Sequence, residues 1–296
     1  MSPVRRNALL LACGLVFQSG MIQLAVALGT VTIVAVTGVD SILGLGPAVF
    51  LVAGALAVGA VDRGRRVHGA GLAISFLVRP DPKAIGAAYA TPAQAARPAA
   101  PLAEILRRPG VATAMVAAVA SFAVMTGVMN LAGAVVVGHG HDHGDVFTVI
   151  SAHIVGMYGL VLVAGDLIER IGRRRSMVIG LTVMAASNAG LAWFASIAGM
   201  SLSLFGLGLG WCLAYIAATT ELVDRAAASE RGRLIGLTDL ISSFGGAALA
   251  LSGGVVYTGA GGSVSLAIAA SGLAVLAAAW VAGNGPVLLP SAAADA

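Results

Sequence analysis

Charged residues, aromatic residues and cysteine are all scarce in this chain. Charged residues make up 10% of the 296 residues and aromatic residues 5%, whereas 58% are hydrophobic. Soluble domains carry about a quarter charged residues, so the composition excludes a water-soluble fold. The two cysteines, Cys13 and Cys212, both fall in long apolar stretches, where a thiol behaves as a small apolar side chain. No disulfide is expected between them.

Long apolar runs are abundant instead. A helix that crosses the hydrocarbon core of a membrane needs about 20 mostly apolar residues. The stretches that meet this length are 8–31, 42–61, 111–138, 147–168, 177–198, 200–220, 234–257 and 263–283. The predicted fold class is therefore all-α, a polytopic transmembrane bundle of about eight spanning helices. The 40 glycines suit such a bundle, because small residues such as Gly206 and Gly210 let helices approach closely.

Positive charge is missing from every second loop between these stretches. If Arg5 and Arg6 lie in the cytoplasm, alternation places all 17 Lys and Arg residues on the cytoplasmic side, as the positive-inside rule requires. The predicted location is the cell (inner) membrane, multi-pass, with both termini cytoplasmic and the lipid bilayer as a partner. Because the basic residues are scattered over short loops without stacking aromatics, no nucleic-acid partner is predicted.

A proline- and alanine-rich segment divides the chain. Residues 79–110 hold six of the ten prolines and no apolar run long enough to cross a membrane. This segment is predicted to be a cytoplasmic linker, partly extended and helical around Leu102 to Arg107. Two spanning stretches precede it and six follow it, and residues 284–296 form a cytoplasmic tail.

The most informative local motif runs from Gly165 through Glu169 to the arginines that end at Arg175. Glu169 is placed at a helix C-terminus, where the helix dipole disfavours negative charge, so a pair with Arg170 or Arg173 is expected. Gly165 would allow close helix contact, and Gly172 would permit a sharp turn. An ordinary positive-inside loop explains the arginines but not the spaced glycines and the glutamate.

This run resembles the cytoplasmic G-x-x-x-(D/E)-R-x-G-R-R loop motif of the major facilitator superfamily of transporters. Three further stretches, 151–158, 206–221 and 229–239, resemble helices and loops of bacterial members. The resemblance implies that 111–283 is a six-helix C-terminal half and 1–78 a partial N-terminal half with a degenerate second copy of the motif. It also implies that the motif residues gate the transport path. These gating residues are Asp62, Arg63, Arg65, Arg66, Gly165, Glu169, Arg170, Gly172, Arg173 and Arg174.

The N-terminal half departs from the family pattern. Residues 69–78 are apolar but too few to span a membrane, and the linker follows directly. Either helices three to five and most of helix six are absent, with 69–78 resembling the end of helix six, or 69–78 form a short interfacial or re-entrant helix.

The complete C-terminal half and the shortened N-terminal half leave two alternative functions. One is a secondary active transporter that moves a small molecule by alternating access, with efflux as one direction. The other is a non-transporting remnant or assembly partner, because alternating access needs two opposed halves. A homodimer could restore that opposition.

Polar residues within the spans are the candidates for the substrate pathway. They are Gln18, Gln23, Asn130, His153, Asn188, Trp211, Tyr215 and Asp239. A lone Asn or Gln in a span can instead bond a neighbouring helix. Asp239 is the strongest candidate, because a carboxylate inside a membrane is costly, although a pair with Arg233 would make it structural.

Three histidines with nearby aspartates occupy the predicted outer loop, at His139, His141 and His143. Imidazoles at two-residue spacing can bind Zn²⁺ or Cu²⁺, whereas a solvated, flexible turn is the simpler alternative. No further ligand shell or catalytic carboxylate accompanies them, so neither a cofactor nor an enzyme activity is predicted.

Overall fold

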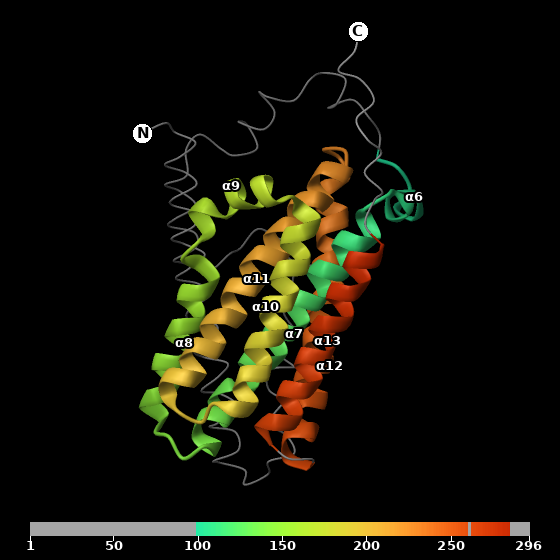
Figure 1. The fold of residues 1–296 in the computed structure, drawn as a ribbon. Helices are drawn as coiled ribbons and strands as arrows, with labels where there is room; N and C mark the ends of the chain where they lie inside the picture. Colours follow the sequence, from blue (N-terminus) through green and yellow to red (C-terminus); the bar gives the residue numbers. More distant parts are fainter. Residues whose placement is uncertain (1–98, 260–261, 285–296) are drawn as a thin grey trace, which may run out of the picture.

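The computed structural model of the chain describes residues 99–259 and 262–284. These residues form helices joined by short turns, so the predicted all-α class is confirmed (Figure 1). The helices are α6 (Leu102–Arg107), α7 (Val111–Gly138), α8 (His143–Tyr158), α9 (Val161–Ile171), α10 (Arg173–Trp193), α11 (Ile197–Arg225), α12 (Arg231–Gly259) and α13 (Ser263–Gly283). The predicted spans 8–31 and 42–61, the segment 69–78 and most of the linker lie outside the described residues.

Five of these helices, α7 and α10 to α13, are long and apolar enough to cross a membrane. α8 and α9 together meet the same test but are bent by 60° where they join. The single span predicted at 147–168 is therefore wrong as one continuous helix. Gly159 and Leu160 separate the two parts, in a stretch that also contains Gly156, and glycine disfavours an uninterrupted helix. Figure 1 shows α9 lying across the ends of the long helices.

Three helices extend beyond the predicted spans at the ends that carry arginines. α10 already begins at Arg173, α11 continues to Arg225, and α12 begins at Arg231. Charged residues end an apolar run without ending a helix, because an arginine can lay its methylene stem on apolar surface while its guanidinium reaches water. α7 and α13, which carry no such residues in their first or last turns, coincide with the predicted 111–138 and 263–283.

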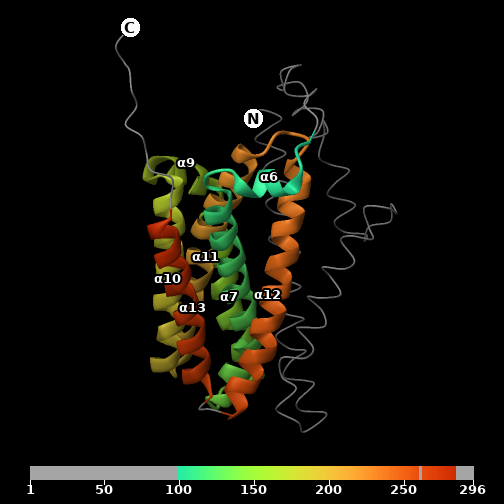
Figure 2. The same cartoon turned by 90° about the vertical axis from the view of Figure 1, so that its right-hand side faces the viewer.

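Close backbone contacts between helices fix the bundle. α10 packs against α11 and α13, α8 against α11, and α12 against α7 (Figures 1 and 2). A Cβ atom at Gly180 would lie 2.5 Å from the carbonyl oxygen of Gly210, and one at Gly210 would lie 2.6 Å from that of Gly180. The close approach predicted at Gly210 is confirmed, since only glycine leaves room for these two backbones.

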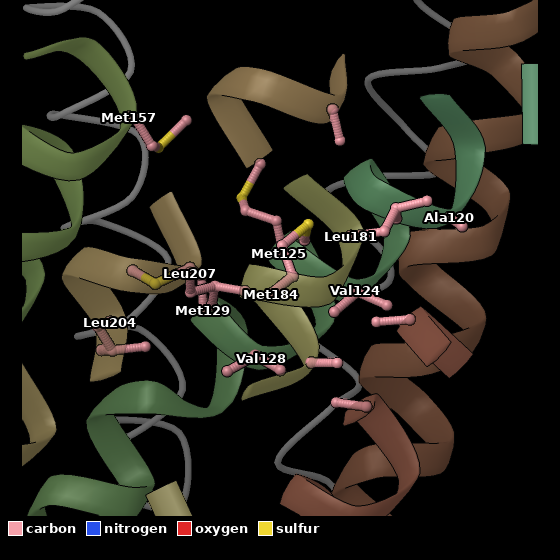
Figure 3. Packing of buried hydrophobic residues seen from close by; sticks show 14 of the residues in the cluster. Ala120, Val124, Met125, Val128, Met129, Met157, Leu181, Met184, Leu204 and Leu207 are labelled. Carbon is pink, nitrogen blue, oxygen red and sulfur yellow. The ribbon is translucent and has the colours of Figure 1, made fainter. Parts of the chain in front are cut away.

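The core lies where α7, α10 and α11 meet. Figure 3 shows Met125 and Met129 of α7 beside Met184 of α10 and Leu207 of α11, all of them buried. Methionine is flexible and fills irregular gaps between helices. This core holds α7 and α11 in the positions from which their polar and aromatic side chains project.

All the described arginines lie at one end of the bundle, which we call the arginine-rich end. They are Arg107, Arg108, Arg170, Arg173, Arg174, Arg175, Arg225, Arg231 and Arg233. The turns after α7, α10 and α12 lie at the opposite end (Figure 1). The helices thus alternate in direction, as the distribution of charge along the sequence predicts.

Candidate functional site

Three aromatic rings meet where α7 and α11 lie together. Trp211 and Tyr215 are one turn apart on α11, and their rings stack with centroids 5.0 Å apart and an interplanar angle of 13°. The ring of Phe122 on α7 lies 6.1 Å from that of Tyr215, tilted by 42°. Residues four apart share one face of a helix, so these rings form a continuous aromatic surface.

A carboxylate from α12 completes this group. The hydroxyl of Tyr215 donates a hydrogen bond of 2.9 Å to Oδ1 of Asp239. Asp239 is exposed, and its partner in the described structure is Tyr215 rather than the alternative Arg233. We call Phe122, Trp211, Tyr215 and Asp239 the aromatic–carboxylate cluster. It offers a flat surface for stacking and a carboxylate for accepting hydrogen bonds.

Trp211 adds a free donor to this cluster. Its indole Nε1 is buried and has no hydrogen-bond partner among the described residues. A buried N–H without a partner costs free energy unless water or a bound molecule satisfies it. The indole N–H of Trp211 is therefore an unsatisfied donor beside the cluster.

The other predicted pathway residues in the described structure are separately buried. Nδ1 of His153 donates to the carbonyl oxygen of Leu204 over 2.9 Å, and its Nε2 has no partner among the described residues. The side-chain amide of Asn188 and the Nδ2 of Asn130 are likewise buried without described partners. No hydrogen bond within 99–259 or 262–284 joins them to the aromatic–carboxylate cluster. Gln18 and Gln23 lie outside the described residues.

An ion-pair network ties α10 to α11 at the arginine-rich end. Nη1 of Arg173 lies 3.2 Å from Oε2 of Glu221 and also pairs with Asp224. Glu221 in turn binds Arg225, with Nη2 and Oε1 2.7 Å apart. Arg174 donates to the carbonyl oxygens of Val281 and Ala282 at the end of α13. The loop motif therefore holds the ends of α10, α11 and α13 together.

Glu169 does not form the ion pair expected of it. It lies exposed on α9, and no described guanidinium is within ion-pair distance of it. The bend before α9 turns this helix across the bundle end, while Arg173 points to α11 instead. Gly172 does make the predicted sharp turn, with a φ of 92° that favours glycine. A Cβ atom added at Gly165 would lie more than 4 Å from the described atoms of other helices, so the helix contact expected there is not found in this part of the chain.

Arg170 is exposed on α9 beside Glu169, and the gating roles of all these motif residues remain predictions. The second, degenerate motif copy lies outside the described residues, with Asp62, Arg63, Arg65 and Arg66. Phe122, Glu221 and Asp224 were not among the residues predicted from the sequence. Glu221 and Arg225 are four residues apart, which is the spacing of an ion pair on one helix face. This spacing is the sequence signal that could have identified Glu221. Nothing in the sequence around Phe122 marks it, because its role comes from packing against another helix.

A second ion pair docks the end of the linker. Nη1 of Arg108 lies 2.6 Å from Oε2 of Glu230, a buried carboxylate in the turn between α11 and α12. The backbone N–H groups of Ala100 and Ala227 also donate to Glu230, over 3.0 and 2.8 Å. The hydrogen bonds from Arg108, followed by those from the backbone, lower the pKa of Glu230 to about 2. The same bond raises the pKa of Arg108.

The histidines of the opposite end do not converge. Nδ1 of His139 donates to the carbonyl oxygen of Val135, and Nε2 of His141 donates to that of Ala195 over 2.6 Å. No group of three or more His, Cys, Asp or Glu side chains in the described residues is placed to hold a metal ion, and this covers His139, His141 and His143. Asp142 and Asp145 instead form a capping box at the start of α8.

Comparison with known proteins gives related sequences. The sequence profile of the Major Facilitator Superfamily matches residues 14–250 and 142–293. The chain is 34% identical over 141 residues to a riboflavin transporter of Brucella anthropi, which covers 48% of this chain and 35% of that protein. It is 30% identical over 197 residues to the uncharacterized MFS-type transporter YdeG of Bacillus subtilis, covering 64% of this chain and 45% of that protein. The chain thus spans less than half the length of these curated relatives.

Proposed function

Since the chain belongs to the major facilitator superfamily of membrane transporters, we propose that it is a secondary transporter that moves a small molecule by alternating access. The observation that carries this proposal is the aromatic–carboxylate cluster. It joins three helices that can each cross a membrane, α7, α11 and α12, and leaves the carboxylate of Asp239 exposed. A carboxylate within a membrane span is costly and usually serves a function. The activity is transport rather than catalysis.

The proposed substrate is a planar aromatic molecule with hydrogen-bonding groups. A flat ring system can stack on Trp211 and Phe122, and hydroxyl groups can donate to Asp239. Riboflavin, which has a flat ring system and a chain of hydroxyl groups, is the first compound to test. The similarity to a riboflavin transporter supports this choice.

The proposed gate is the ion-pair network at the arginine-rich end. Arg173 connects α10 to Glu221 of α11, so opening this end requires the pair to separate or to move as one body. The exposed face of α9, with Glu169 and Arg170, is free to meet an opposing half. We propose that this half comes from residues 1–78 or from a second copy of the chain. Two opposed halves are what alternating access requires.

The experiment that tests the function is transport into and out of proteoliposomes containing the full chain, with radiolabelled riboflavin and efflux measured first. We expect Trp211→Ala to raise the KM about 2- to 12-fold, because stacked aromatic contacts contribute roughly 0.5–1.5 kcal/mol beyond their buried area. Trp193→Ala is the matched control. Trp193 is 83% exposed at the end of α10 and has no described ring contact, so its loss should leave the KM unchanged.

If Trp211→Ala and Trp193→Ala changed the KM equally, the cluster would not be part of the substrate path. If the parent protein moved neither riboflavin nor any of a broad panel of planar compounds, the alternative would hold. The chain would then be a non-transporting remnant or an assembly partner in the membrane.

A further inference from the structure

A large pocket opens at the arginine-rich end of the bundle. Its volume is about 840 Å³, and its walls come from α7, α9, α10, α11 and α13. Pockets of roughly 300–1,000 Å³ are the size that binds small organic ligands. The pocket lies apart from the aromatic–carboxylate cluster, because none of the four cluster residues lines it.

The lining of the pocket is strongly positive. Four guanidinium groups line it, and Glu221 is the one carboxylate among the lining residues described. The four arginines are Arg173, Arg174, Arg175 and Arg225. Arg173 binds both Glu221 and Asp224, and Arg225 binds Glu221. Arg174 donates only to backbone carbonyls of α13, which do not neutralise its charge. Arg175 is exposed and has no ion pair or hydrogen bond in the described part of the chain. The pocket therefore has positive charge that the surrounding protein leaves unneutralised.

The start of α10 adds to this positive field. Gly172 precedes the helix and gives no side-chain cap to its first N–H groups. The first N–H groups of a helix lack partners within it, and the helix dipole is positive there. Both effects favour an anion close to Arg174 and Arg175.

The remaining wall of the pocket is apolar. Met177, Val178 and Ile179 follow the arginines on α10, and Ile179 is 42% exposed. Since α10 can cross a membrane and begins at Arg173, the arginines stand where the polar headgroups lie and the apolar residues stand where acyl chains begin. A soluble phosphate compound would leave this apolar wall uncovered.

We propose that this pocket binds the phosphate headgroup of an anionic phospholipid. Arg174 and Arg175 contact the phosphate oxygens, and Val178 and Ile179 contact the first part of an acyl chain. Basic pockets between membrane helices recognise anionic headgroups by this combination of charge and position. The pocket shares Arg173 and Glu221 with the proposed gate, but its test measures lipid binding and does not rely on transport.

Binding of phosphatidylglycerol to the purified full chain tests the proposal, with native mass spectrometry to count the lipid that is retained. We expect Arg174→Gln with Arg175→Gln to weaken binding about 30-fold, since each basic residue that faces anionic lipid contributes roughly a fivefold factor. Arg175→Gln alone should weaken it about fivefold. This single variant cannot lose a structural contact, because Arg175 makes no described one.

The matched control is Arg231→Gln with Arg233→Gln. Arg231 also donates only to backbone carbonyls, Arg233 is exposed without a described partner, and neither lines the pocket. This variant should bind phosphatidylglycerol like the parent. Equal weakening in both double variants would mean diffuse attraction to the whole charged end and would overturn the proposal.

The source of the phosphate is tested with other ligands. Phosphatidylcholine with the same acyl chains, which has no net charge, should bind about 30-fold more weakly than phosphatidylglycerol to the parent. Inorganic phosphate and glycerol 3-phosphate should not displace the lipid at equal concentration. Displacement by either would identify the pocket as a site for soluble phosphates and would overturn the lipid assignment.

Discussion

At the residue scale, Glu230 shows how one loop carboxylate can hold several segments together. It accepts two hydrogen bonds from Arg108 and one each from the N–H groups of Ala100 and Ala227. The linker, the end of α6 and the turn before α12 therefore all donate hydrogen bonds to the Glu230 carboxylate. Ile105, Leu222 and Leu234 pack as a buried apolar cluster beside it. The ion pair of Glu230 with Arg108 and the buried apolar cluster together hold the end of the linker against the C-terminal helices.

Replacing this carboxylate should loosen α6 in a pH-dependent way. The pKa of Glu230 is about 2 in the docked state against an ordinary value of 4.5, so its contribution is fully present above pH 4.5 and is lost as the pH falls toward 2. We expect Glu230→Gln to speed tryptic cleavage after Arg107 roughly tenfold at pH 7, which is the factor that corresponds to the loss of one hydrogen bond to a charged group. Hydrogen exchange of α6 should show the same difference at pH 5 and a smaller one at pH 3.

The control is Glu104→Gln, which removes an exposed carboxylate from α6 itself. This variant should be cleaved at the parent rate. Similar exchange for the parent and Glu230→Gln across the whole pH range would show that the ion pair does not hold the linker in place.

At the element scale, the structure shows which helices are joined most closely. α10 and α11 meet through Gly180 and Gly210 along their length, and through Arg173 and Glu221 at the arginine-rich end. α9 is turned away by the 60° bend and presents Glu169 outward. The pair α10–α11 is thus closely packed along its length, whereas α9 has an exposed face that carries Glu169.

The two glutamates near the motif should respond differently to neutralisation. Glu221→Gln removes the partner of Arg225 and one of the two partners of Arg173, at a cost between the roughly 0–1 kcal/mol of an exposed pair and the 3–5 kcal/mol of a buried one. We expect it to lower both the melting temperature and the transport rate. Glu169→Gln should lower transport alone, because its side chain has no described partner to lose.

Asp166→Asn serves as the control, since Asp166 is also an exposed acid on α9 but occupies one of the unspecified positions of the motif. It should transport at the parent rate. Parent-like transport by Glu169→Gln as well would contradict a gating role for the motif carboxylate.

Helix packing at Gly180 should tolerate no side chain. In Gly180→Val the new Cβ would meet the carbonyl oxygen of Gly210 at 2.5 Å and the amide nitrogen of Ala214 at 2.6 Å, so the helices must separate. Overpacking of this kind costs about 1–3 kcal/mol, and we expect a melting temperature several degrees lower in detergent. Gly272→Val on α13, where no described atom lies within 4 Å, should melt like the parent. An equal loss in both would assign the effect to glycine itself rather than to the contact.

At the scale of the whole molecule, charge is sorted to one end of the bundle. The arginine-rich end carries both ion-pair networks and the basic pocket, and the opposite end carries the histidine turn. The positive-inside rule predicts that the arginine-rich end faces the cytoplasm.

Cysteine labelling can test this orientation in cells. In a background with Cys13 and Cys212 replaced by alanine, Gly144→Cys should react with an impermeant external thiol reagent, because Gly144 is exposed at the end opposite the arginines. Ala228→Cys, exposed in the turn between α11 and α12, should react only after the membrane is opened. The reverse pattern of labelling would contradict the predicted topology. It would also contradict the prediction that the proposed gate faces the cytoplasm.

The sequence alone determined the class, the family and the direction of the helices. Apolar runs long enough to span a membrane and the one-sided arginines carry this information locally, as do the spaced glycines of the loop motif. The turn at Gly172 followed from sequence for the same reason, because a positive φ is a property of one residue.

Only the tertiary structure decided which side chains meet. The helix bends near Gly159, and Arg173 pairs with Glu221 rather than with Glu169. The ring of Phe122 lies against that of Tyr215, and Tyr215 donates a hydrogen bond to Asp239. These contacts join helices that are far apart in the sequence. They depend on how the helices are rotated and how closely their backbones approach, and that is set by the packing of the whole bundle rather than by any single segment.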